Sequence, residues 1–219
     1  MLSKSTLAGA AALLAAPIVV IAGTLAQPTL SDDAAAQVAA LTVYRGPMIA
    51  GMTLRTFGLI LFIAGTVWLA LTLAPRAPRL AMAGGLLGVL GSLVVLFESG
   101  VGAAAPAIVD TLDRAQATAV LDHINSGPIS ALDPLSILGD IGIALLGIAV
   151  ARAGAPRWAA AAIVIGALGE GAGFATGTKA LVIAGFAVMF AGLLQAVRCL
   201  AAGPGRLPVP ETARVAAVS

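Results

Sequence analysis

Five charged residues interrupt or border long apolar stretches of the chain, and they are the residues best placed to do chemistry. They are Arg55, Glu98, Asp140, Glu170 and Lys179. A charged side chain that faces lipid alone costs about 2.5–3.5 kcal/mol on an insertion scale, so these side chains are expected to point into a helix bundle. We treat the five as one candidate site, an intramembrane charge cluster near the outer side of the membrane.

The cluster has two interpretations, and the sequence leaves both open. Arg55, Asp140 and Glu170 are expected at a similar depth, about 10 Å below the outer interface at about 1.5 Å per helical residue. In the structural interpretation Arg55 pairs with Glu98, Asp140 or Glu170 in a closed ion-pair network that fixes helix register. In the functional interpretation the same groups line an outward-open cavity for a small solute, a cation or a proton, because intramembrane ionisable groups often mark such pathways.

Other chemistry finds little support in the sequence. The one histidine, His123, is expected on a surface helix, and the one cysteine, Cys199, next to the membrane on the inside. Zinc and haem sites need several such ligands, and the chain has no phosphate-binding glycine loop. We therefore predict no catalytic residue, no metal site, no cofactor and no enzyme activity.

Composition indicates a membrane protein. Of the 219 residues, 60% are hydrophobic and only 10% are charged, and the mean hydropathy is +1.05. A soluble domain of this size needs far more charge to cover its surface. The net charge of +2 does not indicate nucleic-acid binding, because the basic residues sit at the ends of apolar stretches, as orientation signals do. The predicted partner is the lipid bilayer.

Six apolar stretches are long enough to cross a bilayer and predict an all-α bundle of six transmembrane helices. Their expected bounds are 7–25, 48–73, 80–97, 135–151, 158–176 and 180–197. Residues 1–198 form the expected membrane domain, and the Pro- and Gly-rich residues 199–219 form an expected disordered cytoplasmic tail.

The basic residues predict the orientation. An N-terminus on the inside places Lys4, Arg76, Arg79, Arg152, Arg157, Arg198, Arg206 and Arg214 in the cytoplasm and leaves the outer segments acidic. By the positive-inside rule both termini are then cytoplasmic, in a bacterial inner membrane. The alternative is that the first span is a signal peptide cleaved after Ala26.

Two short amphipathic helices are predicted on the outer side. The first follows Ser31 as its N-cap and places Val38 and Leu41 on one face. The second begins at Pro106, a residue favoured at the first helical position, and ends at 125–127. The apolar face of this second helix is expected to hold Ile108, Leu112, Ala115 and Ala119.

The turns after the second and fourth spans resemble each other. When 77–91 is aligned without gaps on 155–169, eight of the fifteen positions are identical. The sequence leaves open whether this is a true duplication or common helix-start chemistry. Glycines at small-xxx-small spacing predict close helix packing or a homodimer contact; they are Gly84, Gly88, Gly169 and Gly173.

The turn Arg152-Ala153-Gly154-Ala155-Pro156-Arg157-Trp158 carries a resemblance to a known family. Together with the order of spans and outer helices, it resembles an uncharacterised bacterial six-transmembrane-helix family catalogued as a domain of unknown function. Here one residue fewer separates Gly154 from Pro156, and the aromatic and histidine positions associated with span four are missing. The resemblance implies a six-helix fold and supplies no activity.

Two functions follow as hypotheses. The first is a non-enzymatic structural or assembly component of the membrane, which joins with itself or with a partner protein. The second is a small transporter or sensor with an outward-facing charged pocket, in which Arg55, Asp140 and Glu170 bind a small solute, a cation or a proton.

Overall fold

The computed structural model describes residues 4–31, 33–127 and 130–202. Within these ranges the chain is all-α, with seven α-helices, one 3-10 helix and no strand, which confirms the predicted fold class. The helices are α1 (Lys4–Ala26), α2 (Ala34–Leu73), α3 (Pro78–Thr111), α4 (Arg114–Ser126), η1 (Ser130–Ser136), α5 (Ile137–Arg152), α6 (Arg157–Ala175) and α7 (Lys179–Ala202).

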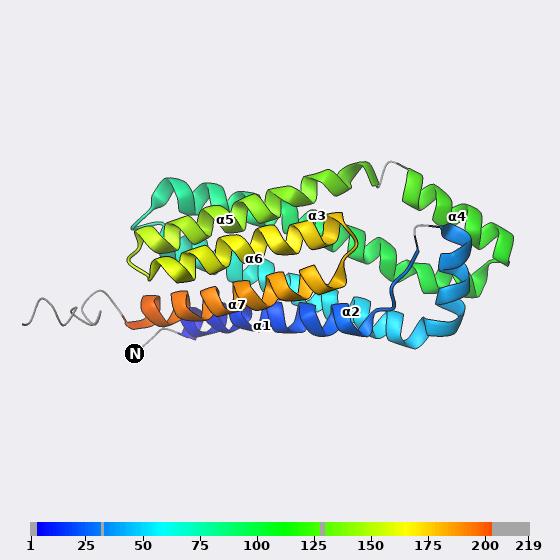
Figure 1. The fold of residues 1–219 in the computed structure, drawn as a ribbon, viewed down its shortest axis with the longest axis horizontal. Coiled ribbons are helices and arrows are strands. Elements are labelled where there is room, and N and C mark those ends of the chain that lie inside the picture. Colours follow the sequence, from blue (N-terminus) through cyan, green and yellow to red (C-terminus); the bar gives the residue numbers. More distant parts are fainter. Residues whose placement is uncertain (1–3, 32, 128–129, 203–219) are drawn as a thin grey trace, which may run out of the picture.

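In the described part of the chain, six helical segments are long and apolar enough to cross a membrane, as the hydropathy predicts. Two are far longer than the predicted spans, since α2 has 40 residues and α3 has 34. At about 1.5 Å per residue they extend about 60 Å and about 51 Å, whereas the hydrocarbon core of a bilayer is about 30 Å thick. Both helices therefore project from the bundle, and α4 lies at the projecting end (Figure 1).

The six long helices form a closed ring. Each packs mainly against two neighbours, in the order α1, α2, α3, α5, α6, α7 and back to α1. The start of α1 and the end of α7 lie together at the end of the bundle opposite α4 (Figure 1). We call these two ends the terminal end and the α4 end.

Glycine allows two of the ring contacts to be very close. In α3, Gly84 and Gly88 lie against Gly142 of α5, where a side-chain carbon on Gly142 would approach the Gly84 carbonyl oxygen to 2.7 Å. In α6, Gly173 faces Val182 of α7, and the predicted packing position Gly169 also faces α7. Lipid provides no hydrophobic force between helices, so close backbone contact is a main source of their association.

The similar stretches 77–91 and 155–169 occupy comparable places in the ring. In each, glycines of the helix that follows the Pro-Arg turn pack on the next spanning helix: α3 on α5, and α6 on α7. That parallel fits a duplication, which stays a prediction.

The first predicted outer helix is not separate. The side chain of Asp33, rather than Ser31, caps α2 by accepting a hydrogen bond from the backbone N–H of Ala35 at 2.8 Å. The helix then continues into the span through a kink at Tyr44, where φ is −107° and ψ is 28°, three residues before Pro47. Val38 is buried on this segment, as predicted from its spacing.

The second predicted outer helix starts later than expected. Pro106 lies inside α3 rather than at a helix start, and the break comes at Leu112. Asp113 caps α4 by accepting from the backbone N–H of Gln116 at 2.9 Å. The new start changes which face is buried, so α4 buries Ala117 and Leu121.

Two expectations for that helix are corrected accordingly. Ala115 and Ala119, expected on its apolar face, are exposed. Ile108 and Leu112 do pack against the apolar cluster at the α4 end, but they belong to the end of α3.

The tail also differs from its prediction. Helix α7 continues to Ala202, so Cys199 is half-buried in a helix rather than in a disordered segment. The rest of the expected tail, 203–219, lies outside the described residues.

The close contact between α3 and α5 predicts the effect of a small substitution. Gly142→Ala should lower the free energy of unfolding in detergent by about 1–3 kcal/mol, because the added carbon meets the backbone of α3. Gly100→Ala in α3 is the matched control, since its added carbon meets nothing within 4 Å. The control should be neutral or stabilising, by about 0.5–1 kcal/mol. Thermal unfolding of the two variants measures the difference, and equal stability would contradict the packing.

Candidate functional site

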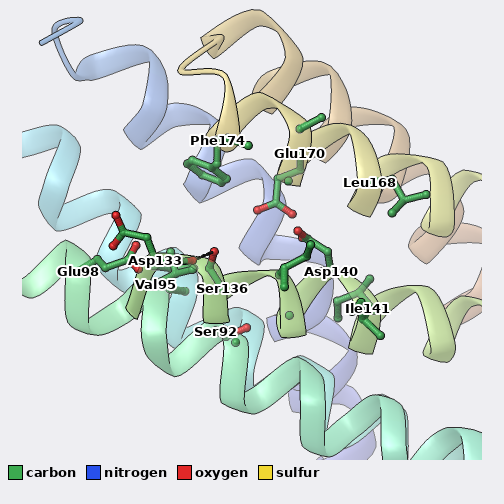
Figure 2. Close-up of a pocket in the computed structure, with 18 of the residues that line it drawn as sticks. Ser92, Val95, Glu98, Asp133, Ser136, Asp140, Ile141, Leu168, Glu170 and Phe174 are labelled. Atoms are coloured by element: carbon green, nitrogen blue, oxygen red, sulfur yellow. Dashed lines mark hydrogen bonds between the residues drawn. The ribbon is translucent and has the colours of Figure 1, made fainter. Parts of the chain in front are cut away.

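A cavity of about 860 Å³ lies within the helix ring, lined by residues of α2, α3, η1, α5, α6 and α7 (Figure 2). Five ionisable side chains contribute to its wall: Arg55, Glu98, Asp133, Asp140 and Glu170. The structure thus brings four of the five predicted residues to one cavity and adds Asp133.

One pair of carboxyl groups joins α5 to α6. The carboxyl groups of Asp140 and Glu170 point toward each other (Figure 2). The Asp140 carboxyl lies directly against Gly171, where any side chain would collide with it. Because a carboxylate only accepts hydrogen bonds, two facing carboxylates repel each other, and a proton or a cation between them would remove that repulsion.

A second pair of carboxyl groups joins α3 to η1. The side chains of Glu98 and Asp133 lie near each other on the cavity wall (Figure 2). The loop is held by Ser136, whose hydroxyl donates to the backbone oxygen of Asp133 at 2.6 Å. One oxygen of Glu98, Oε1, is buried without a hydrogen-bond partner.

Sequence reasoning placed Asp133 only among the acidic residues of the outer loop. A signal was present, because Asp133 precedes Asp140 by seven positions. That spacing makes about two helical turns, which places the two side chains on one face of a helix that begins before Asp133. The 3-10 helix η1 supplies that continuation.

Arg55 does not form the expected ion pair. Within the described residues, the one pair with nitrogen and oxygen inside 4.0 Å joins Arg45 to Asp110, at 2.5 Å and partly exposed. The Arg55 guanidinium instead stacks on the ring of Phe174, 4.7 Å from its centroid, and its Nε is buried without a hydrogen-bond partner. It is still close enough to Glu98 and Glu170 to attract both carboxyl groups.

Lys179 does not line the cavity. It stands at the start of α7, where its Nζ donates a hydrogen bond to the backbone oxygen of Gln27, just after α1. This contact ties two neighbouring helices of the ring together, so the structure places Lys179 apart from the other four charges.

The charges lie at two levels rather than one. From the terminal end, Arg55 lies about 27 Å along α2 and Glu98 about 30 Å along α3, at about 1.5 Å per residue. By the same measure Asp140 lies about 18 Å along α5, and Glu170 about 20 Å along α6. The Asp140–Glu170 pair is therefore about 7–12 Å nearer the terminal end. The similar depth expected for Arg55, Asp140 and Glu170 is corrected accordingly.

Apolar side chains make up the rest of the cavity wall. Phe62 of α2 and Phe186 of α7 are buried and meet edge to face, with ring centroids 6.5 Å apart. Ile137 and Leu168 also line the cavity and are more than half exposed, at 56% and 57%. The site therefore combines paired acids with aromatic and aliphatic surface.

No group of three or more His, Cys, Asp or Glu side chains among the described residues could hold a metal ion. His123 is exposed on α4 and does not line the cavity.

Comparison of the chain with protein-family models, curated proteins and solved structures finds no match. The resemblance to a six-span family of unknown function stays a prediction.

Proposed function

We propose that the chain is a small transporter or sensor of the membrane, whose cavity binds a small cationic solute in competition with protons. The observation that supports this most is the cavity itself, in which four carboxyl groups and one guanidinium surround shared space rather than forming close ion pairs. The structural role, which the sequence placed first, calls for a compact and closed ion-pair network. Arg55 stacked on Phe174 is not such a network.

The paired carboxyl groups are the reason why a cation and a proton compete for the cavity. Burying net charge in a medium of low dielectric constant is costly, so the cavity favours a state close to neutral. Carboxyl groups can reach that state by taking up protons or by binding a cation. A cation that enters therefore displaces a proton, and a proton that enters displaces a cation.

The proposal includes an orientation in a bacterial inner membrane. Arg76, Arg79, Arg152 and Arg157 all flank the two turns at the terminal end, opposite α4. By the positive-inside rule that end is cytoplasmic and the cavity lies nearer the outside.

Cysteine labelling tests this orientation. Ala119→Cys, exposed on α4, is introduced in a Cys199→Ser background. A membrane-impermeant maleimide should react with it from outside intact cells, because α4 is then on the outer side. Reaction only after lysis would reverse the orientation.

Removal of the carboxyl group of Asp140 or of Glu170 should abolish the exchange of a cation for a proton. The full chain is reconstituted into liposomes with an acidic lumen and a trapped pH dye, and sodium, potassium, guanidinium or tetramethylammonium is added outside. For the wild type we expect at least one of these cations to raise the lumenal pH. Asp140→Asn and Glu170→Gln should lose that response, because each removes one of the two facing carboxyl groups that would take up or release the proton.

Asp122→Asn is the matched control, since Asp122 is exposed on α4 and does not line the cavity. It should behave as the wild type. If the two cavity variants only lower thermal stability in detergent while their flux equals that of the wild type, the cluster is structural and the proposal fails.

A further inference from the structure

We infer that the solute enters this cavity sideways from the membrane, through an opening between α5 and α6, and is a long-chain amphiphile with a cationic head. This inference rests on the proposed function and names the route and the class of its substrate. Three observations lead to it: some apolar residues of the cavity wall face lipid, α5 and α6 diverge, and the gap between them lies at the depth of the hydrocarbon core.

Three residues that line the cavity also lie on the outer surface of the helix ring, and we call them the rim. Ile137 and Ile141 of α5 are 56% and 42% exposed, and Leu168 of α6 is 57% exposed. At helical spacing from the rim, exposed Ile148 and Ile165 continue the same stripe on each helix toward the terminal end. On a spanning helix the exposed stripe faces lipid. The cavity therefore reaches the lipid-facing surface of the ring where the two stripes meet.

Helices α5 and α6 separate toward the α4 end. At the terminal end the short turn 153–156 joins them, and a carbon added to Gly147 would come within 3.2 Å of the backbone oxygen of Ala160. Nearer the α4 end, the three atoms closest to a carbon added to Gly171 all belong to the carboxyl group of Asp140. A side chain, rather than close backbone, thus lies between the two helices at this level. The ring opens here between α5 and α6.

The opening lies within the hydrocarbon core of the membrane. Measured from the terminal end at about 1.5 Å per residue, Ile141 lies about 17 Å along α5 and Leu168 about 17 Å along α6. Ile137 lies about 23 Å along α5 by the same measure. A core about 30 Å thick that begins at the basic turn between α5 and α6 places all three residues in its outer half. Lipid chains therefore reach the rim.

Carboxyl groups lie just inside this apolar rim. Asp140 and Glu170 lie at about 18–20 Å, between the levels of the rim residues. Figure 2 shows Ile141 and Leu168 beside them, one on each helix. Four carboxyl groups and one guanidinium line the cavity, a composition that favours a cationic head over an anionic one. The head of an amphiphile can thus reach the acids while its chain stays in lipid against the rim.

Photo-labelling of the full chain in liposomes tests the side entrance. The probe is a long-chain alkyltrimethylammonium with a diazirine beside its head, and the matched probe carries a sulfonate head on the same chain. We expect the cationic probe to label Phe62 and Phe186, which line the cavity and are only 7% and 3% exposed. The sulfonate probe should label them on the order of tenfold less, because the acids repel its head. Mass spectrometry locates the adducts, and labelling of lipid-facing Ile148 and Ile165 by both probes is the internal reference.

A larger side chain at the rim tests the route itself. Leu168→Trp should reduce labelling of Phe62 and Phe186 severalfold, because the indole fills the opening. Ile165→Trp is the matched control, since Ile165 is 62% exposed on the same stripe of α6 and does not line the cavity. It should be labelled as the wild type is. The comparison of the two probes on the wild type keeps the test independent of any variant's folding.

The outcomes distinguish this inference from the proposed function. If both probes label only the lipid-facing residues, the side entrance is wrong, and a response to sodium or tetramethylammonium in the liposome assay leaves the proposed function standing. If the sulfonate probe labels the cavity as strongly as the cationic probe, the ligand class is wrong. If Leu168→Trp labels as Ile165→Trp does, the route is wrong. If the cationic probe labels the cavity but no cation moves protons, the side entrance holds and the proposed exchange fails.

Discussion

The carboxyl groups that face each other inside the helix ring are the constraint on which the rest of this site depends. A carboxylate in a membrane bundle must find a cation, a donor or a proton, because lipid offers none. In this protein the acids face each other across elements: Asp140 of α5 lies opposite Glu170 of α6, and Glu98 of α3 lies near Asp133 of η1. Each pair brings two like charges together, and a proton or a bound cation would relieve that repulsion.

Arg55 forms no close ion pair with these acids and makes a different contact. Its guanidinium stacks on Phe174 of α6, while α2 and α6 are not neighbours in the ring. The stack spans the cavity from one side of the ring to the other, and a desolvated contact of this kind contributes about 2 kcal/mol. Arg55 thus balances charge for both acid pairs without closing the space between them.

Hydropathy and length predict the six spans because lipid imposes one rule: a spanning helix must be apolar over the thickness of the hydrocarbon core. The same rule singles out Arg55, Glu98, Asp140 and Glu170, since charges in apolar stretches stand out and must face inward. Which charge meets which could not be predicted. That choice depends on helix rotation and register, and here on glycine: Gly171 leaves room for the Asp140 carboxyl, and Gly142 sets how closely α5 approaches α3.

Other differences between the predicted and the observed site have local causes. Lys179 stands at a helix end, where a backbone oxygen of Gln27 accepts its hydrogen bond. Asp133 belongs to a loop by composition and joins the cavity only because η1 extends the line of α5.

Infrared difference spectroscopy of the carboxyl groups tests the central claim most directly. We expect a protonated-carboxyl band at neutral pH in the unliganded wild type, one that shifts in heavy water and changes when Glu170→Gln removes one partner of the Asp140–Glu170 pair. Asp122→Asn should leave the band unchanged. Absence of any protonated carboxyl at neutral pH, or a band that Glu170→Gln leaves unaltered, would contradict a proton held between the facing carboxyl groups and the cation–proton competition proposed for the cavity.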